Sequence, residues 1–371
     1  MTARQRDPIV VQGLGVHCRH DSDKAQPGSN MTPPARRPQP VKLVDVARQA
    51  GVSLATASRA LSSPQLVRDN TLKKVRAAVS ALGYVPHGAA RALASQRTRT
   101  IGAVFPPIDN PIFATGTRAL SEELNSAGYT LLLATHLYDE LGELDAVRRL
   151  LERGVDGMVL VGLQHHPEIF ELLEQSGVPY ELTWLADPGS VHYNVGVDHR
   201  RASGAMTSHL ASLGHREFAV IAGTVTTNDR ARDRLLGVRD ALREEKIGLP
   251  EDRIEYAEFA LINGRQSLAR LLARAPGFTA LICANDVLAI GAIQECRIRE
   301  IVVPGQLSVV GFDDIEMAAA VTPALSTVRL PSDDIGRCAG RRLLDRLAGH
   351  EVPVSERLPT ELIFRDTVAP R

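Results

Sequence analysis

The sequence has few cysteines and no long apolar run, and we expect no signal peptide. Among its 371 residues the only cysteines are Cys18, Cys283, Cys296 and Cys338. They form no CxxC pair and have no histidine at metal-ligand spacing, which argues against a disulfide or zinc framework and for a reducing compartment. No apolar segment approaches the roughly 18 residues needed to span a bilayer. Apolar residues make up 44% of the chain, so an ordinary globular core is expected.

Familiar catalytic motifs are also missing. No lysine follows a glycine, which excludes a P-loop, and neither GxSxG nor HExxH occurs. His165 and His166 precede a proline in a polar segment without further ligands, so we expect a solvated turn there. Asp313 and Asp314 are candidates for acid–base chemistry, but neighbouring side chains point apart, and a role as ligand and cap is simpler. We predict that the protein is not an enzyme and has no cofactor, metal site or catalytic residue.

Charge is distributed unevenly, although the whole chain has a formal net charge of zero. Residues 41–99 carry ten basic and two acidic groups, a net charge of +8, whereas residues 100–371 carry a net charge of −11. A small basic module beside a large acidic one indicates a polyanionic partner for the basic module. Residues 1–40 lack apolar periodicity, so we expect a disordered extension there. Ordered patterning begins just after Met31, which makes it a candidate start of translation beside Met1.

The basic module has the pattern of a helix-turn-helix. Residues 43–50 carry apolar side chains at helical spacing, Gly51 interrupts them, and Ser53 can cap a second helix over residues 53–61. The inner faces of the two helices are predicted to be Val46, Ala47, Val52, Ala57 and Leu61. The outer face of the second helix then consists of Leu54, Ala55, Thr56, Ser58 and Arg59.

A third helix is predicted over residues 71–82, with Asp69 or Asn70 as its cap. Its polar face carries cations that can reach phosphate groups, namely Lys73, Lys74 and Arg76. The alternative to a DNA-binding module is an ordinary three-helix bundle, but such a bundle would not require the positive charge.

The segment from Val41 to Thr100 resembles the DNA-binding end of the lactose-repressor (LacI) family. The resemblance rests on VKLVDVARQAGVSLATASRALSSP and, after a short interval, on TLKKVRAAVSALGYVPHGAARALASQRTRTIG. It implies that the second helix lies in the major groove and that Leu54, Ala55 and Arg59 read bases there. Arg59 can donate two hydrogen bonds to a guanine edge, and the two apolar side chains can touch a thymine methyl group. The alternative is that these side chains are solvent-facing helix residues without a ligand.

The alanine-rich segment after Pro86 resembles the hinge helix of the same family. Alone it would be a marginal helix, and the resemblance implies that it folds when paired with its copy on operator DNA. Leu93 falls where the family inserts a leucine into the minor groove, and Ala90 falls where the two hinge helices pack together. For Leu93 the alternative is a linker residue that touches the larger domain. We include Arg91 of this segment among the DNA-binding candidates.

From Thr100 onward, apolar runs alternate with amphipathic segments. Buried parallel strands are predicted at residues 101–105, 131–134, 157–161, 218–222, 281–283 and 307–311. Helices are predicted between them, including residues 120–125, 143–153, 201–213, 230–245 and 264–275. This alternation implies an α/β fold with doubly wound parallel sheets. The segment is too long for one such sheet, so we predict two similar lobes.

The acidic module resembles the periplasmic-binding-protein fold that serves as the effector domain of the LacI family. Four local signatures, NPIF at 110–113, RLLG at 234–237, AND at 284–286 and GFDD at 311–314, lie where loops leave strands or helices begin. The resemblance implies that Arg234, Asn285 and Asp313 contact the hydroxyl groups of an effector.

Aromatic side chains complete the predicted ligand site. Phe113 and Trp184 can stack on a sugar ring, although a core role for Trp184 is equally open. Asp286 can instead cap its helix. The effector-binding candidates are Asn110, Phe113, Trp184, Arg234, Asn285 and Asp313.

Together these patterns predict a multidomain chain with a small all-α helix-turn-helix domain and a two-lobed α/β, periplasmic-binding-protein-like domain. Its parts are a disordered extension at 1–40, the helix-turn-helix at 41–85, a hinge and linker at 86–99 and an effector-binding and dimerisation domain at 100–371.

The predicted function is a cytoplasmic, nucleoid-associated transcriptional repressor, controlled by a sugar or sugar acid. We expect it to bind a palindromic operator as a homodimer, with a tetramer as the alternative. One rival function is a binding protein for solute uptake, which the basic module and the missing signal peptide oppose. The other is an enzyme fused to a DNA-binding module, which lacks a catalytic constellation.

Overall fold

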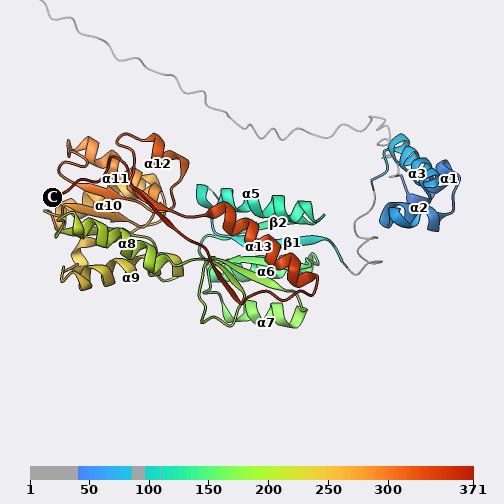
Figure 1. The fold of residues 1–371 in the computed structure, drawn as a ribbon, viewed down its shortest axis with the longest axis horizontal. Helices are drawn as coiled ribbons and strands as arrows, with labels where there is room; N and C mark the ends of the chain where they lie inside the picture. The colour runs from blue at the N-terminus through green and yellow to red at the C-terminus, as the bar shows by residue number, and fades with distance from the viewer. Residues whose placement is uncertain (1–40, 86–96, 109) are drawn as a thin grey trace, which may run out of the picture. The chain divides into compact units, whose positions relative to one another are not determined.

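The computed structural model describes residues 41–85, 97–108 and 110–371. The chain divides into two compact units, Met1–Val85 and Pro86–Arg371. Among the described residues, the first unit is all-helical and the second contains every strand (Figure 1). Over the same residues, no helix combines the length and the apolarity that a membrane crossing requires.

The first unit consists of three helices joined by short turns. They are α1 (Leu43–Ala50), α2 (Leu54–Ser62) and α3 (Asp69–Leu82), with the 3-10 turn η1 (Pro64–Leu66) before α3. Helix α1 ends at Gly51, whose φ of 64° suits a residue without a Cβ atom. The Ser53 hydroxyl accepts a hydrogen bond from the Thr56 amide at 3.1 Å and so caps α2. The predicted helix-turn-helix is confirmed.

The core of this unit is small and apolar. Val46, Ala57 and Val75 are fully buried, and Val52 packs against the same cluster. The third helix begins earlier than predicted, at Asp69, and Arg68 is its N-cap without a side-chain cap bond. The predicted cap by Asp69 or Asn70 is therefore wrong, because the helical backbone already runs through both residues.

The first lobe of the second unit is a parallel sheet between two pairs of helices. Its strands are β1 (Thr100–Phe105), β2 (Thr130–Thr135), β3 (Gly157–Val161), β4 (Tyr180–Leu185), β5 (Asn194–Val197) and β11 (Ser355–Arg357). They lie in the order β11-β5-β4-β3-β1-β2. The helices are α5 (Pro111–Ser126) and α13 (Ser332–Leu347) on one face, and α6 (Glu140–Glu152) and α7 (Pro167–Ser176) on the other (Figure 1).

The second lobe repeats this plan with a smaller sheet. Its parallel strands are β6 (Phe218–Ala222), β7 (Ile254–Tyr256), β8 (Ala280–Cys283) and β9 (Ser308–Val310), in the order β7-β6-β8-β9. An antiparallel pair, β10 (Thr327–Arg329) and β12 (Glu361–Ile363), lies beside them. The helices are α8 (His199–Ser212), α9 (Asp229–Glu244), α10 (Leu261–Arg274), α11 (Asp286–Ile298) and α12 (Glu316–Ala320), with the 3-10 turn η2 (Glu251–Arg253).

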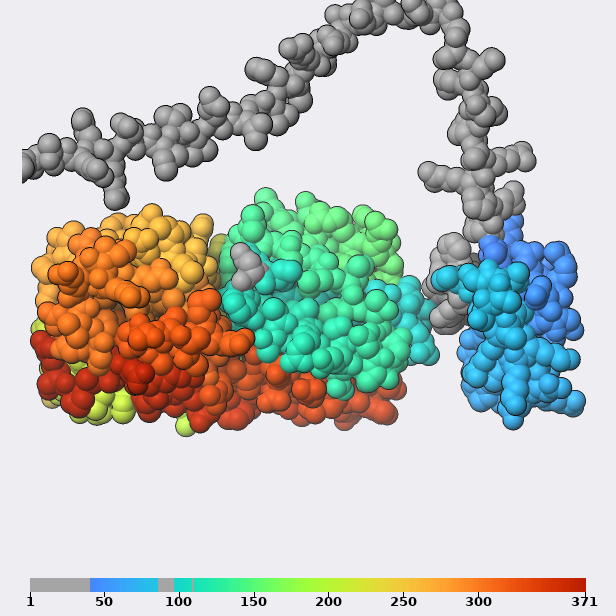
Figure 2. Space-filling model, turned by 90° about the horizontal axis from the view of Figure 1, so that it is seen from above, coloured from blue at the N-terminus to red at the C-terminus, as the bar shows by residue number. Residues whose placement is uncertain are grey.

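The chain crosses between the lobes three times. It does so between β5 and α8, between β10 and α13, and between β11 and β12. The last part of the chain therefore runs along both lobes, as the orange-to-red surface in Figure 2 shows. One apolar cluster contains residues of α5 and α13 as well as residues of α8 and α9. The two predicted lobes with parallel sheets are confirmed, and three segments of the chain join them.

Strand and helix positions agree with the prediction where the apolar pattern is strong. The strands predicted at 157–161 and 218–222 have the same bounds in the structure. The helix predicted at 120–125 is only the second half of α5, which begins at Pro111 behind the capping side chain of Asn110. Strands β4 and β5 were not predicted, because β4 carries the buried polar residues Glu181 and Thr183 and lacks a continuous apolar run.

Candidate functional site

The outer face of α2 is an exposed patch of five neighbouring side chains. Leu54, Ala55, Ser58 and Arg59 are exposed, and Leu54 keeps 52% of its surface although it is apolar. Thr56 is half-buried, and its hydroxyl lies 2.8 Å from the Ser53 hydroxyl, so it takes part in the helix cap. The predicted outer face thus lies together on one surface.

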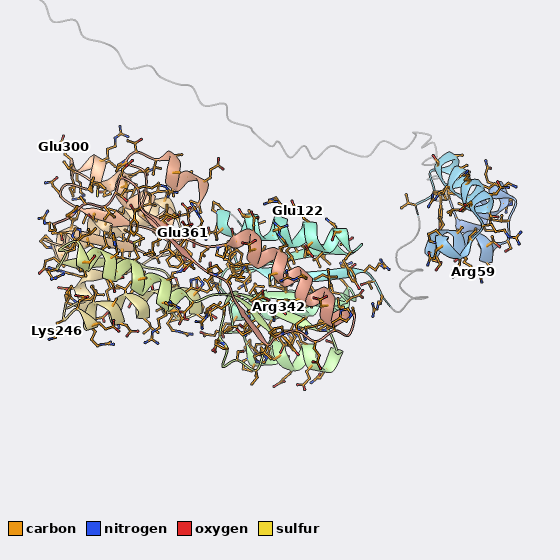
Figure 3. All side chains as sticks on the ribbon, viewed as in Figure 1. Arg59, Glu122, Lys246, Glu300, Arg342 and Glu361 are labelled. Carbon is orange, nitrogen blue, oxygen red and sulfur yellow. The ribbon has the colours of Figure 1, made fainter. Side chains whose placement is uncertain are left out.

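Arg59 lies on the outside of the helical bundle (Figure 3). Among the described residues, no carboxylate or carbonyl group pairs with its guanidinium. Lys73, Lys74 and Arg76 of α3 are exposed as well. An unpaired arginine with an apolar neighbour on an exposed helix can donate hydrogen bonds to a base edge or a phosphate. The predicted DNA-binding residues Arg91 and Leu93 lie outside the described residues.

The six predicted effector-binding residues line a single cavity between the two lobes. The space among its side chains is about 350 Å³, part of it open to solvent. The predicted residues in its wall are Asn110, Phe113, Trp184, Arg234, Asn285 and Asp313. The remaining lining residues are Ile112, Tyr138, His199, Asn228, Arg230, Ala231, Phe259 and Leu330. We call this space the inner cavity. It lies beside two of the interlobe crossings, at His199 and Leu330.

Arg234 is the central polar group of the inner cavity. Its Nε donates a hydrogen bond to His199 Nδ1 at 3.1 Å, and its Nη2 lies 3.3 Å from Asp313 Oδ1. Its Nη1 donates to the Ala284 carbonyl, and its guanidinium lies 4.0 Å from the centre of the Phe312 ring. Burial lowers the pKa of Arg234 from its usual value, and the Asp313 carboxylate opposes this. The guanidinium is thus held in one position in the wall of the cavity.

His199 is neutral and fixed in one tautomer. Its Nε2 lies 2.8 Å from the Trp184 carbonyl oxygen and donates to it, while Nδ1 accepts from Arg234. Complete burial lowers the pKa of His199 well below its usual range. Because α8 begins at His199, immediately after the first interlobe crossing, this ring connects the crossing to the cavity wall.

Asp313 presents a buried carboxylate to the cavity. Its backbone lies in the left-handed region with φ 115°, and its amide donates to the Val328 carbonyl at 2.8 Å. Burial raises the pKa of Asp313 to about 6, although Arg234 and Arg230 favour the charged form. The neighbouring Asp314 instead pairs with Arg329 and Arg365 at 2.7 Å each, so the two carboxylates do point apart.

Asn285 brings an unsatisfied donor to the inner cavity. Its Oδ1 accepts a hydrogen bond from the Leu288 amide at 3.0 Å and caps α11. Its Nδ2 is buried and has no partner among the described residues. A buried N–H group without an acceptor is costly, so this position favours a ligand or water oxygen. The predicted cap by Asp286 is wrong, since its carboxylate instead accepts from the Ile315 amide and the Thr327 hydroxyl.

Aromatic rings form much of the remaining wall. Phe113 and Trp184 meet edge to face with ring centres 5.1 Å apart, and both are almost fully buried. The Trp184 ring also packs against α5, where a Cβ atom on Gly116 would lie 2.8 Å from it. Trp184 therefore has the core role and also lines the cavity. Tyr138 of the first lobe and Phe259 of the second meet with ring centres 6.3 Å apart.

Arg230 and Asp229 connect the lobes next to the inner cavity. Asp229 accepts hydrogen bonds from the Leu163 amide at 2.6 Å and the Gln164 amide at 3.0 Å, both in the first lobe. Arg230 Nη1 binds Asp229 at 2.8 Å and the Val161 carbonyl at 3.2 Å. Although burial opposes it, Arg230 and these amides lower the pKa of Asp229.

Several lining residues were not predicted from the sequence. Arg230 lies four positions before Arg234, and this spacing places both on one helix face, which is a signal that could have identified it. Tyr138, His199 and Phe259 carry no such local signal. They reach the cavity only because the two lobes bring different loops together.

The expected solvated turn at His165 and His166 is wrong for His165. That ring is buried, with Nδ1 3.0 Å from Glu143 Oε1 and Nε2 3.1 Å from the Gly162 carbonyl oxygen. His166 caps α7 through a 3.3 Å bond from the Glu168 amide. In the part of the chain that the structure describes, no group of His, Cys, Asp and Glu side chains is arranged to hold a metal ion.

Comparison with known proteins identifies relatives of both units. The model of bacterial regulatory proteins of the lacI family matches residues 42–87, and the model of a periplasmic binding protein-like domain matches residues 207–368. The HTH-type transcriptional regulator DegA of Bacillus subtilis (strain 168) is 33% identical over 336 residues, which cover 88% of this chain and 98% of that protein.

Solved structures agree with the sequence relatives. A LacI-family transcriptional regulator from Silicibacter pomeroyi matches with a TM-score of 0.81 at 27% identity, covering 89% of this chain and 100% of that one. The Lac repressor dimer bound to operator and the anti-inducer ONPF matches with a TM-score of 0.80 at 26% identity, again over 89% and 100%. The similarity thus extends across both units.

Proposed function

Since the chain belongs to the LacI family of bacterial transcriptional regulators, we propose that it represses genes by binding a palindromic operator as a homodimer. We further propose that a sugar-like small molecule in the inner cavity changes its affinity for that operator. The protein is a transcriptional regulator and not an enzyme. Its place of action would be the cytoplasm, on the nucleoid, where the operator lies.

The α2 face would read the operator. Arg59 would donate to a guanine edge, Leu54 and Ala55 would contact thymine methyl groups, and the Ser58 hydroxyl would bind a base or phosphate. Thr56 would stabilise the start of α2 and contact the backbone of the DNA. Two further residues, Arg91 and Leu93, would act from the hinge segment, with Leu93 inserted into the minor groove.

The observation that carries the effector proposal is the buried Asn285 amide, whose Nδ2 lacks an acceptor in the cavity wall. Together with Arg234, Asp313 and Asn110 it supplies donors and acceptors that match vicinal hydroxyl groups. Phe113 and Trp184 supply the apolar wall against which the C–H face of a sugar ring would pack.

Coupling between the cavity and the DNA would run through the lobes. A ligand that contacts both lobes favours their closed arrangement, and the first lobe is the one that continues into the hinge segment. A coupling free energy of about 1–3 kcal/mol would change operator affinity from several-fold to about a hundredfold. The Lac repressor, a structural neighbour, was itself solved with an operator and an anti-inducer.

The test is fluorescence anisotropy with labelled palindromes from upstream of its own and neighbouring genes, at several salt concentrations. Each titration is repeated with a panel of sugars and sugar acids. We expect one palindrome to bind at least about a thousandfold more tightly than random DNA, and one compound to shift that affinity.

Arg59→Ala and Arg76→Ala form a matched pair for this test. Arg59→Ala should weaken the free energy of binding to the operator by about 1–3 kcal/mol and that of binding to random DNA only slightly, because a base contact is lost. Arg76→Ala should weaken both by the same factor, because a phosphate contact carries no sequence information. Equal losses for both variants on both DNAs would contradict the role of α2, and no palindrome preference at all would contradict the proposed function.

A further inference from the structure

A loop of the first lobe, residues 161–165, binds the second lobe through its backbone, and we call it the docking loop. Two of its amides donate to Asp229, and the Val161 carbonyl accepts a hydrogen bond from Arg230. The contact leaves no space at Gly162, where a Cβ atom would overlap Arg230 Nη1 and lie 3.0 Å from both Asp229 carboxylate oxygens. The position of the docking loop therefore determines how the two lobes meet beside the inner cavity.

His165, the last residue of the docking loop, lies between two hydrogen-bond acceptors. Its Nδ1 is 3.0 Å and 3.1 Å from the two carboxylate oxygens of Glu143 on α6, and its Nε2 is 3.1 Å from the Gly162 carbonyl oxygen. The His165 side chain is fully buried, so the pair needs either an N–H group at both ring nitrogens or a proton on the Glu143 carboxyl. Because imidazole is a stronger base than a carboxylate, we place this extra proton on the ring.

His199 has the opposite arrangement and provides an internal comparison. One of its ring nitrogens donates to the Trp184 carbonyl oxygen, and the other accepts from Arg234. A donor on one side and an acceptor on the other fit a neutral ring, whereas two acceptors fit the extra proton of the Glu143–His165 pair. The partners of each buried ring thus determine how many protons it holds.

The other ionisable groups around the pair do not replace this proton. They are His136 after β2, His192 before β5, Asp229 and Arg230 of α9, and Glu168 of α7, which pairs with Arg148. Burial lowers the pKa of both histidines, and His136 Nε2 is 3.8 Å from Glu143 Oε1, beyond hydrogen-bond distance. Although burial opposes it, the positive charges of Arg230 and His165 both lower the pKa of Asp229. A proton on His165 therefore also favours the charged form of the carboxylate that binds the docking loop.

We propose that the extra proton of the Glu143–His165 pair keeps the docking loop against the second lobe, and that operator affinity depends on pH through this contact. The regulatory part of this inference rests on the proposed function, whereas the contact between the lobes does not. As the pH rises through about 5–8, where imidazole groups commonly titrate, the pair loses the proton and one acceptor loses its donor. The docked loop is therefore favoured at the lower end of this range.

Hydrogen exchange of the full chain tests the contact itself. The reporters are the Leu163 and Gln164 amides, which bind Asp229 across the lobes. The reference is the Leu288 amide, which binds Asn285 within the second lobe. After correction for the intrinsic effect of pH on exchange, we expect protection of the reporters to fall at least about tenfold relative to the reference from pH 6 to pH 8.

Glu143→Gln separates the proton from the shape of the pair. Its amide group can donate to Nδ1 while a neutral His165 ring donates to the Gly162 carbonyl, so every hydrogen bond is made without the extra proton. We expect protection of the docking loop to stay within about threefold of the wild type at pH 6 and not to fall by pH 8. The matched control is Glu152→Gln on the same helix, an exposed residue that should keep the wild-type pH profile.

Nitrogen-15 NMR of protein with labelled histidine detects the proton directly. The His165 signals are those that change in Glu143→Gln. At pH 6 we expect protons on both ring nitrogens of His165 in the wild type but on only one of His199, as their partners require. A single proton on the wild-type His165 ring, or the same exchange profile in the wild type and Glu143→Gln, would overturn the proton-dependent contact.

Operator anisotropy at pH 6 and pH 8 tests the regulatory part, with the palindrome that binds in the test of the proposed function. The change in operator affinity between the two pH values should differ at least about threefold between the wild type and Glu143→Gln. An equal change in both proteins would overturn the link between the contact and DNA binding. If no palindrome binds, the proposed function fails, and the exchange profiles still decide whether the contact depends on the proton.

Discussion

The outer face of α2 and the inner cavity are built in opposite ways. The α2 face comes from one helix and consists of exposed side chains, and Arg59 has no partner among the described residues. The inner cavity takes residues from Asn110 to Leu330, and each of its charged groups is buried and paired with an opposite charge. The face can therefore change its target without affecting the fold, whereas a change in the cavity alters stability and ligand response together.

The largest expected effect is at Arg234. Replacing it with alanine leaves the Asp313 carboxylate and the Ala284 carbonyl without their buried partner. We expect Arg234→Ala to lower the free energy of unfolding by about 3–5 kcal/mol and to abolish the effector response. Urea denaturation measures the first and operator anisotropy the second.

Arg243→Ala is the matched control on the same helix. The Arg243 side chain is 74% exposed and pairs with Asp240, so Arg243→Ala should lower the free energy of unfolding by less than about 0.5 kcal/mol. If Arg234→Ala were as mild as this control, the cavity would not depend on buried ion pairing, and the contrast with the α2 face would disappear.

The next effect is a pH dependence from Asp313. Its pKa is about 6 in the folded chain against 3.8 as the usual value, so the folded state retains the proton after the unfolded state has lost it. The free energy of unfolding of the wild type, relative to that of Asp313→Asn, should therefore fall by up to about 3 kcal/mol as the pH rises from about 4 to 6. At higher pH the difference should stay constant. Denaturant unfolding of both proteins across this range measures the difference. A difference that does not change with pH would show that the carboxylate is not held in a low-dielectric site.

A smaller effect is expected where Asp229 joins the lobes. Asp229→Asn keeps the shape but replaces a charged acceptor of two first-lobe amides with a neutral one. We expect the free energy of unfolding to fall by about 1–3 kcal/mol and hydrogen exchange to become faster at the Leu163 and Gln164 amides. Asp233→Asn, on the same helix, is the control, since no hydrogen bond joins Asp233 to the first lobe in the described residues. Unchanged exchange in Asp229→Asn would argue against an interlobe role.

The smallest effect is at Leu54. Leu54→Ala should leave unfolding within about 0.5 kcal/mol, because the side chain is exposed, but should lower operator discrimination by about 1 kcal/mol. Leu66→Ala, in the same unit with 71% exposure, should change neither quantity. A thermal melt measures the stability of each variant, and an anisotropy titration measures its operator discrimination. A loss of stability in Leu54→Ala would show that this face also contributes to the stability of the fold.

Much of the candidate site could be predicted because its signals are local. The apolar spacing before Gly51 and the capping serine determine the helix-turn-helix within twenty residues. Asn110 and Asn285 cap helices and Asp313 follows a strand, where side chains of an α/β fold meet at one edge, whereas Arg234 lies within α9. Residues such as Tyr138 and His199 have no such pattern, and the buried position of His165 depends on Glu143, which lies in another element.

By itself the sequence determined the family, the alternation of helices and strands, the separation of a basic module from an acidic one and the identity of six cavity residues. The alternation and the charge separation follow from periodicity and composition, which are local properties of the chain, whereas the family and the cavity residues follow from the resemblance of its motifs to the LacI family. Only the tertiary structure decided which groups are paired and that Asn285 Nδ2 lacks a partner among the described residues. Those properties arise where three interlobe crossings bring distant loops together. Burial and pairing depend on the distance between groups in space, and the spacing of residues along the chain does not specify that distance.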